Sequence, residues 1–299
     1  MSLLFNIFLI YMFVFIGFLA KRIHPDTMHE QAFVKLYIYF LMPFVMIWGI
    51  LSKPLSKDLF VIPMVFLLIL LFGFAISLCV SKFWLADPKN QAIGAITGLI
   101  GNTGNMGIPI GLAVYGIESV PYTAMINLIN AIFVMTIGAY IYSRGSFSVN
   151  ASIMNVLKLP MVWATGLAFF IQWKHILISK DVFHFLEMGA YTGLVIQLII
   201  FGMFLATVSW NTFYPKIATI VLACKFIVLP MIALSFVRLF KINHFFSQLL
   251  FLQTLVPVAV NNVNLASLYD CYPNKVAWIS FISFVLGFGW LPIGLLLMR

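Results

Sequence analysis

Long apolar runs recur along this chain and leave little room between them for polar segments. Ten of these runs come close to the roughly 20 residues that a helix needs to cross a bilayer. Only 8% of the 299 residues are charged, against about a quarter in a soluble domain. We therefore expect an all-α integral membrane protein, and a single water-soluble domain is excluded. The runs lie near residues 3–20, 31–51, 59–80, 90–117, 119–143, 158–173, 183–208, 215–237, 245–269 and 276–298.

The charged residues lie mostly between these runs. Lys and Arg number 17 against eight Asp and Glu, which gives a net charge of +9. They occur singly or in pairs, as membrane-flanking charges do, and form no stripe that could follow the phosphates of a nucleic acid. With the N-terminus outside, the inner loops would hold eight basic residues and the outer side seven, so the orientation stays open. We expect a multi-pass protein of the cell membrane, plasma or inner.

A polar segment divides the ten runs into two equal groups. Residues 144–157 are a predicted linker loop, with 143 residues before it and 142 after it. Residues 1–143 and 158–299 thus hold five predicted membrane helices each. Two copies with an odd number of helices must insert in opposite orientations, as the inverted repeats of many secondary transporters do. We therefore predict ten transmembrane helices in two inverted five-helix repeats.

The fourth run cannot continue as an ordinary helix. Residues 101–109 contain three glycines together with Asn102, Asn105 and Pro109. Proline lacks the N–H of a helical bond and clashes with the carbonyl four residues back, and each glycine costs a helix about 1 kcal/mol. Backbone groups freed inside a bilayer must be buried in protein or line a wet cavity. The segment therefore predicts a site.

The ninth run has a matching interruption. Pro257 is followed by three asparagines, Asn261, Asn262 and Asn264. In each half the interruption falls in the fourth run, and a pair of broken helices at corresponding positions is typical of a transporter's binding site. Residues three apart on a helix share a face, which applies to Asn261 and Asn264 and to the two asparagines of the fourth run.

Simpler interpretations of the two segments are available. The glycines of the fourth run include pairs with the spacing of closely packed membrane helices, and a single membrane asparagine often bonds to a neighbouring helix. Neither explains five asparagines beside prolines at corresponding positions. A phosphate-binding loop is excluded because the glycine spacing differs and no Lys-Ser/Thr pair follows.

Charge indicates what such a site would bind. A broken helix exposes the N-terminal end of its second half, which carries roughly half a positive charge. Lys225 lies midway along the eighth run, where a lysine costs about 2.5–3.5 kcal/mol and is normally functional or paired. Glu187 and Asp270 lie near run ends, so we expect no carboxylate at that depth. An anion, most simply a carboxylate, suits this field. A purely structural Lys225, satisfied by backbone carbonyls or snorkelling, stays open.

The sequence offers no set of residues for catalysis or for holding a metal. His29 and Glu30 lack a second histidine at position 33, which is Phe33, so no zinc-protease pair exists. We find no nucleophile–base pair and no loop long enough for a soluble output domain. We therefore expect neither an enzyme nor a sensor, and no metal or cofactor. A channel built on the same broken helices stays open as the nearest alternative.

The fourth run resembles a known motif. Its residues 101–109, Gly-Asn-Thr-Gly-Asn-Met-Gly-Ile-Pro, are followed by Tyr115 and Gly116 and look like the fourth-helix motif of the auxin efflux carrier family, in the bile acid/auxin transporter superfamily. That family includes bacterial and archaeal carriers described as malonate-type or dicarboxylate permeases. Relatives usually carry Arg at position 225, and the short linker is typical of a microbial member. The likeness covers nearly the whole chain and extends to Pro43, Phe201, Gly202, residues 225–230, Pro257, Ala266 and Tyr269.

This resemblance implies elevator-type alternating access, with the fourth and ninth helices crossing at their prolines and the substrate bound at the crossover. The expected function is secondary active transport of a small organic anion such as malonate, malate or an auxin-like acid. We expect one of Asn262 and Asn264 to face a neighbouring helix. Coupling to Na⁺ or H⁺, a homodimer, an anion channel and a sodium-coupled bile-acid-like symporter all stay open. The predicted substrate-binding residues are Asn102, Asn105, Pro109, Lys225, Pro257, Asn261, Asn262 and Asn264.

Overall fold

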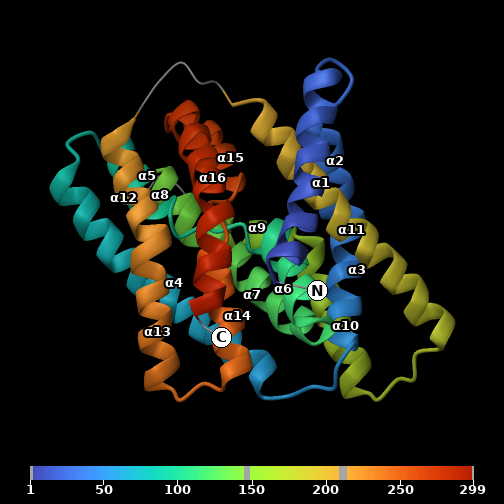
Figure 1. Cartoon of the computed structure of the whole chain (residues 1–299). Coiled ribbons are helices and arrows are strands. Elements are labelled where there is room, and N and C mark those ends of the chain that lie inside the picture. The colour runs from blue at the N-terminus through green and yellow to red at the C-terminus, as the bar shows by residue number, and fades with distance from the viewer. Residues whose placement is uncertain (1–2, 145–148, 209–213, 298–299) are drawn as a thin grey trace. The chain divides into compact units, whose positions relative to one another are not determined.

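The expected all-helical class is confirmed. The computed structural model describes residues 3–144, 149–208 and 214–297, and this part of the chain contains helices and no strand (Figure 1). Its one isolated β-bridge joins Gly101 to Val258. Helices satisfy their own backbone hydrogen bonds, which a bilayer requires of any segment that faces lipid.

Seven helical segments in the described part of the chain are long and apolar enough to cross a membrane. Each coincides with a predicted run, so a multi-pass membrane protein is confirmed. The other three predicted runs are short or interrupted: 158–173 holds a helix of 14 residues, and 90–117 and 245–269 each hold two helices. Ten crossings in inverted repeats therefore remain a prediction. The seven segments are Phe5–Ile23, Glu30–Leu51, Asp58–Trp84, Ile117–Tyr142, Lys180–Ala206, Pro215–Leu239 and Pro273–Leu297.

The chain divides into two compact units, each of which takes segments from both halves of the sequence. Unit 1 consists of Met1–Phe60, Gly104–Leu128 and Asn155–Thr207, and unit 2 of Val61–Thr103, Ile129–Met154 and Val208–Arg299. The units are therefore not the predicted repeats 1–143 and 158–299, which stay a prediction about sequence organisation. The predicted linker 144–157 contains a short helix, α9 (Val149–Leu157).

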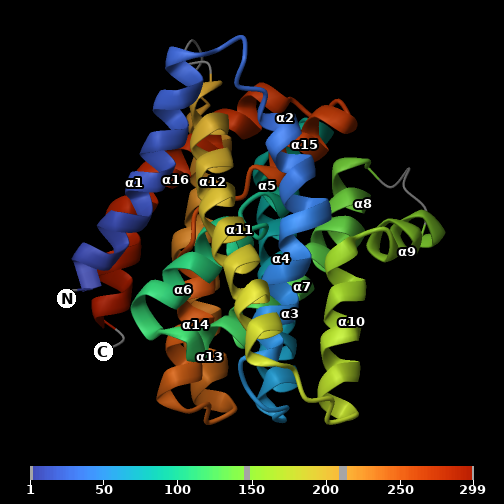
Figure 2. The ribbon, with the colours of Figure 1, turned by 90° about the vertical axis from the view of Figure 1, so that its right-hand side faces the viewer.

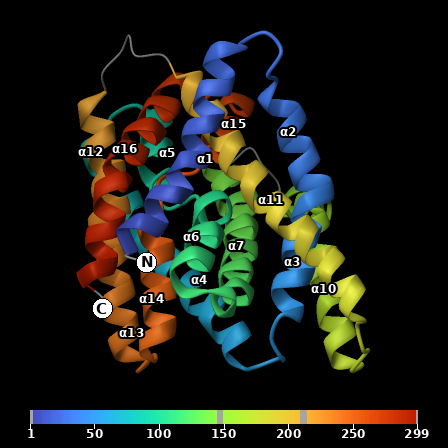
Figure 3. The same cartoon turned by 45° about the vertical axis from the view of Figure 1, so that its right-hand side comes forward.

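Unit 1 is built on close contact between α1 and α11, which lie against each other in Figure 3. A Cβ atom on Gly202 would overlap the carbonyl oxygen of Val14, and one on Gly17 would overlap that of Ile199. The two backbones can approach this closely only because both residues lack side chains. Beside this pair, α3 and α10 pack together (Figure 2). The helices of unit 1 are α1 (Leu3–Ile23), α2 (Glu30–Leu36), α3 (Met42–Leu51), α6 (Ile108–Tyr115), α10 (Pro160–Trp173) and α11 (Lys180–Ala206).

Unit 2 packs the predicted break at Pro257 against a long C-terminal helix, α16 (Pro273–Leu297). On α16, Gly287 lies against the ring of Pro257, and Gly294 lies against Leu255 and Phe251. The other helices are α4 (Asp58–Trp84), which begins in unit 1, α5 (Pro88–Ile96), α8 (Ala139–Tyr142), α12 (Pro215–Ala223), α13 (Leu229–Leu239), α14 (His244–Leu255) and α15 (Asn261–Leu268). The fifth predicted run, α7 (Val120–Phe133) followed by a π-helical turn and α8, is shared between the units.

The glycine contact in unit 1 gives a stability prediction. We expect Gly202→Ala to lower the apparent melting temperature of the purified protein by about 5 °C or more, because overpacking of this kind costs about 1–3 kcal/mol. Gly166→Ala, on α10, is the matched control, since a Cβ there has no neighbour within 4 Å. Equal melting temperatures for the two variants in the same detergent would contradict the close contact.

Candidate binding site at the helix breaks

In unit 2, residues 100–102 at the start of the first predicted break lie beside residues 257–259 of the second and bond to them. The backbone N–H of Asn102 donates to the carbonyl of Pro257 over 2.8 Å, and that of Ala259 donates to the carbonyl of Ile100 over 2.9 Å. The N–H of Val258 donates to Oγ of Ser283 on α16 over 2.6 Å. These bonds satisfy backbone groups that the breaks remove from their helices. Asn102 and Pro257, predicted from different halves of the sequence, are thereby brought together.

The prolines do not act alike. Pro257 lies in the non-helical segment between α14 and α15, where its missing N–H ends the ladder of α14. Pro109, which we expected to break the fourth run, instead lies buried in the first turn of α6, a position where proline is tolerated. The fourth run leaves the helix earlier, after Ile96, and returns through a π-helical turn at Thr103–Gly107. The glycines and asparagines, more than Pro109, accompany this break.

Asn262 is the residue that holds the two breaks together. Its Nδ2 donates to the carbonyl oxygens of Ile100 over 3.1 Å and Ala259 over 3.0 Å. Its Oδ1 accepts from the hydroxyl of Tyr142 over 3.1 Å, and Tyr142 lies 2.8 Å from Oγ1 of Thr97. Because Tyr142 gives its only proton to Asn262, Thr97 is the donor of that second bond. The amide of Asn262 is fully used within the protein, as expected for one of the pair Asn262 and Asn264.

The other two asparagines of α15 point away from this network. Asn261 and Asn264 are exposed, whereas Asn262 is fully buried. The exposed pair shares a helix face, as their spacing of three residues predicted. Asn105 and Pro109 belong to unit 1, where Asn105 is half-buried in the π-helical turn Thr103–Gly107. The predicted residues are therefore distributed over both units.

Several buried amides around the breaks have hydrogen-bonding atoms without a partner. Nδ2 of Asn102 is one, although Asn102 is only 4% exposed. Asn130 donates to the carbonyl of Gly101 over 3.1 Å while its Oδ1 has no partner, and both polar atoms of the Gln253 side chain lack one. A buried polar atom left unpaired costs about 1–3 kcal/mol, so such atoms indicate a ligand or water. Asn130 and Gln253 were missed in the sequence, where single polar residues within apolar runs were the available signal.

Lys225 lies at the same place. It is 1% exposed, in a π-helical turn between α12 and α13, and its Nζ is 2.5 Å from where a Cβ of Gly101 would be. Among the described residues, no carboxylate lies within ion-pair distance of this ammonium. Lys225 thus lies next to the breaks, as its depth in the eighth run led us to expect, and among the described residues no acidic side chain pairs with its charge.

An ion pair also joins the start of the fourth run to the residue that follows the ninth run, outside the membrane-spanning helices. Nζ of Lys89, at the start of α5, lies 2.6 Å from Oδ2 of Asp270, which follows α15. The hydrogen bond and charge of Lys89 hold the pKa of Asp270 below its usual value. Beside them, burial raises the pKa of the Cys271 thiol to about 11, and its Sγ lies 3.4 Å from the carbonyl of Lys89. The breaks are thus anchored both at their centre and at one end.

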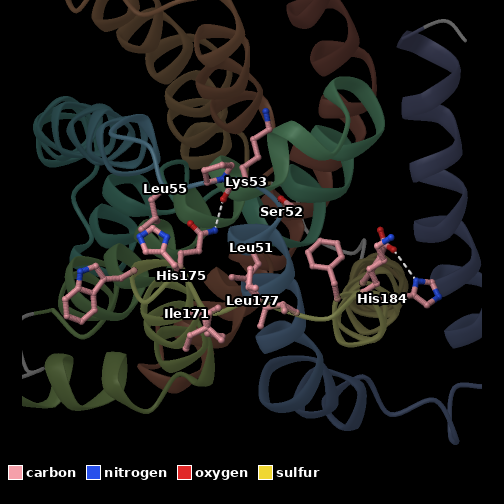
Figure 4. Close-up of a pocket in the computed structure, with 16 residues that line it drawn as sticks. Leu51, Ser52, Lys53, Leu55, Ile171, His175, Leu177 and His184 are labelled. Atoms are coloured by element: carbon pink, nitrogen blue, oxygen red, sulfur yellow. Dashed lines mark hydrogen bonds and ion pairs between the residues drawn. The ribbon is translucent and has the colours of Figure 1, made fainter.

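Unit 1 has a separate cavity of about 800 Å³ (Figure 4). It is lined by residues 51–55, at the end of α3 and just beyond it, and by residues of 171–187, around the α10–α11 connection. Nε2 of Gln172 closes one side by donating to the carbonyls of Ile50 and Lys53, both over 2.6 Å. None of the predicted binding residues lines this cavity, which lies at helix ends. The helix breaks remain the candidate site.

Comparison with known proteins agrees with these features. The model of a family described as membrane transport protein matches residues 2–151, half of the chain. The chain belongs to this family, that of the auxin efflux carriers. An uncharacterized transporter of Methanocaldococcus jannaschii is 24% identical over 268 residues, 85% of each chain. The predicted family is confirmed, and this protein is a membrane transporter.

The network around Asn262 gives a second prediction. We expect Asn262→Ala to destabilise the protein by about 1–3 kcal/mol, because it leaves the carbonyl of Ile100 and the hydroxyl of Tyr142 buried with fewer partners. Asn264→Ala is the matched control on the same helix, since Asn264 is exposed. Thermal unfolding of both purified variants measures the difference, and an Asn262→Ala protein as stable as Asn264→Ala would contradict the role of the Asn262 hydrogen bonds in holding the breaks together.

Proposed function

We propose that this protein is a secondary active transporter that moves a small organic anion across the cell membrane by alternating access. The substrate would be a carboxylate such as malonate, malate or an auxin-like acid, bound at the helix breaks. The observation that carries the proposal is the unpaired, buried amide donor of Asn102 beside two paired helix breaks. Discontinuous helices that meet in this way are the usual substrate site of secondary transporters.

We assign the binding residues as follows. Asn102, Asn105 and Asn261 would donate to the carboxylate, with Asn264 on the same face of α15 as Asn261. Pro257 would shape the break of the ninth run, Pro109 would begin the returning helix α6 after the break of the fourth run, and Asn262 would hold the two breaks in register. The N-terminal end of α15, which begins at Asn261, adds a partial positive charge suited to an anion.

The division of the chain supports an elevator-type mechanism. Unit 1 takes the first two predicted helices of each half, residues 1–60 and 155–207, and unit 2 takes most of the rest of both halves. The first two predicted helices of each half thus fall in the same unit, as two inverted five-helix repeats with ten crossings would lead one to expect, whereas Gly104–Leu128 of the first half belongs to unit 1 and all of the second half after Thr207 belongs to unit 2. Movement of one unit relative to the other would then expose the site to each side of the membrane in turn.

Uptake into proteoliposomes tests this function. We expect uptake of at least one of malonate, malate, succinate and indole-3-acetate to saturate with concentration and to show counterflow, because a carrier binds its substrate before each crossing. Uptake that rises linearly without counterflow would instead identify a channel. A homodimer is compatible with either result.

Substitutions at the breaks test the site. We expect Asn105→Ala and Pro257→Ala to abolish uptake, and Asn102→Ala to lower it by about tenfold or more, as loss of a buried hydrogen bond to a charged group costs about 1.5–3 kcal/mol. Asn274→Ala, at the exposed start of α16, is the control for removal of an amide. All variants must be recovered as folded protein, and normal uptake by the first three would remove the site assignment.

A further inference from the structure

Each helix break has two ends, and the carbonyl ends have opposite charge to the amide ends. In unit 2, α5 ends at Ile96 and α14 ends at Leu255, so both breaks present a C-terminal end. Each such end carries roughly half a negative charge from the aligned peptide dipoles of its helix. At the end of α5 the carbonyls of Ala95 and Ile96 accept hydrogen bonds from Ser77 and from the N–H groups of Leu99 and Ile100. The site is therefore not uniformly positive, and its carbonyl side favours a cation.

Pro257 makes this preference stronger on α14. In a continuous helix, the N–H of residue 257 would bond to the carbonyl of Gln253, but proline has no N–H. The last helical bond of α14 runs from Val256 to Leu252. The carbonyl of Gln253 is thus released at the break, where lipid offers it no donor.

The ammonium of Lys225 lies at this carbonyl end. A Cβ atom placed on Gly101 would lie 2.5 Å from Nζ of Lys225 and 3.7 Å from the carbonyl oxygen of Gln253. The turn that carries Lys225 packs against Gly98, two residues beyond the end of α5, where a Cβ would lie 3.2 Å from the Cβ of Cys224 and 3.5 Å from the backbone nitrogen of Lys225. Two glycines therefore let the lysine reach the space between the ends of α5 and α14.

The charges balance. Two C-terminal ends of roughly half a negative charge each are matched by one ammonium, and among the described residues no carboxylate pairs with it. Snorkelling does not account for this position, because the side chain is 1% exposed and lies in the middle of the span Pro215–Leu239. In transporters with broken helices, carbonyl ends and unwound backbone are where a coupling cation binds.

We infer that Lys225 is the resident cation of this site, so that transport of the anion needs no dissolved Na⁺. The inference rests on the proposed function and restricts its coupling. The lysine fills the carbonyl side of the breaks with a covalently attached positive charge. The amide side, with Asn102 and the start of α15, is left for the substrate carboxylate.

Uptake in sodium and choline salts tests this inference. We expect wild-type uptake to be equal in the two salts, Lys225→Arg to keep it, and Lys225→Met to lower it by about tenfold or more, since a missing buried charge costs several kcal/mol. Lys216→Met, at the exposed start of α12, is the control. Wild-type uptake that falls at least tenfold in choline, or normal uptake by Lys225→Met, would overturn the inference and leave carrier function intact.

A second measurement does not depend on transport. If the wild type moves none of the acids in either salt, the proposed function fails, and melting of the purified proteins decides about Lys225. We expect Na⁺, compared with choline, to stabilise Lys225→Met and to leave the wild type and Lys216→Met unchanged, because only an emptied cation position can bind the ion. An equal response of all three proteins would overturn the inference.

Discussion

The structure of unit 2 depends on how it satisfies backbone groups that two broken helices set free. Water is scarce at that depth and lipid provides no hydrogen-bond partner. Two backbone bonds between residues 100–102 and 257–259, the hydroxyl of Ser283 and the amide of Asn262 supply the partners. The breaks are thus possible only as a pair, because each supplies donors or acceptors that the other lacks. A transporter gains from this arrangement a polar, non-helical centre inside an otherwise apolar fold.

Charge follows from the same geometry. The ends of α5 and α14 collect carbonyl groups, while the start of α15 collects amide groups. In our proposal Lys225 compensates the first set and the substrate the second, which separates two roles that a single positive site would combine. Unpaired atoms of Asn102, Asn130 and Gln253, residues far apart in sequence, lie in unit 2 near the breaks. They are the groups that a substrate or ordered water would complete.

Much of this could be predicted from the sequence, for identifiable reasons. Hydropathy predicts the long spans because a bilayer imposes their length, and asparagines beside prolines mark the breaks. The position of Lys225 follows from its depth in an apolar run. Pro109 was assigned the wrong local role, since a proline in a first helical turn and one that ends a helix look alike without the hydrogen-bond pattern. Asn130 and Gln253 were visible only as single polar residues within apolar runs, and the role of Tyr142 could not be predicted, because the contacts of all three join segments far apart in sequence. The grouping into two units depends on such contacts as well.

The network of Thr97, Tyr142 and Asn262 has an evolutionary consequence. Each hydrogen-bonding atom of the Asn262 amide is engaged, and because Oδ1 of Asn262 takes the single proton of Tyr142, Thr97 must donate to Tyr142. A substitution at any one of the three positions leaves a hydrogen-bonding group of the next without its partner. We therefore expect substitutions at these positions to occur together or not at all. Related chains that lack the asparagine are then expected to carry compensating replacements at the other two positions.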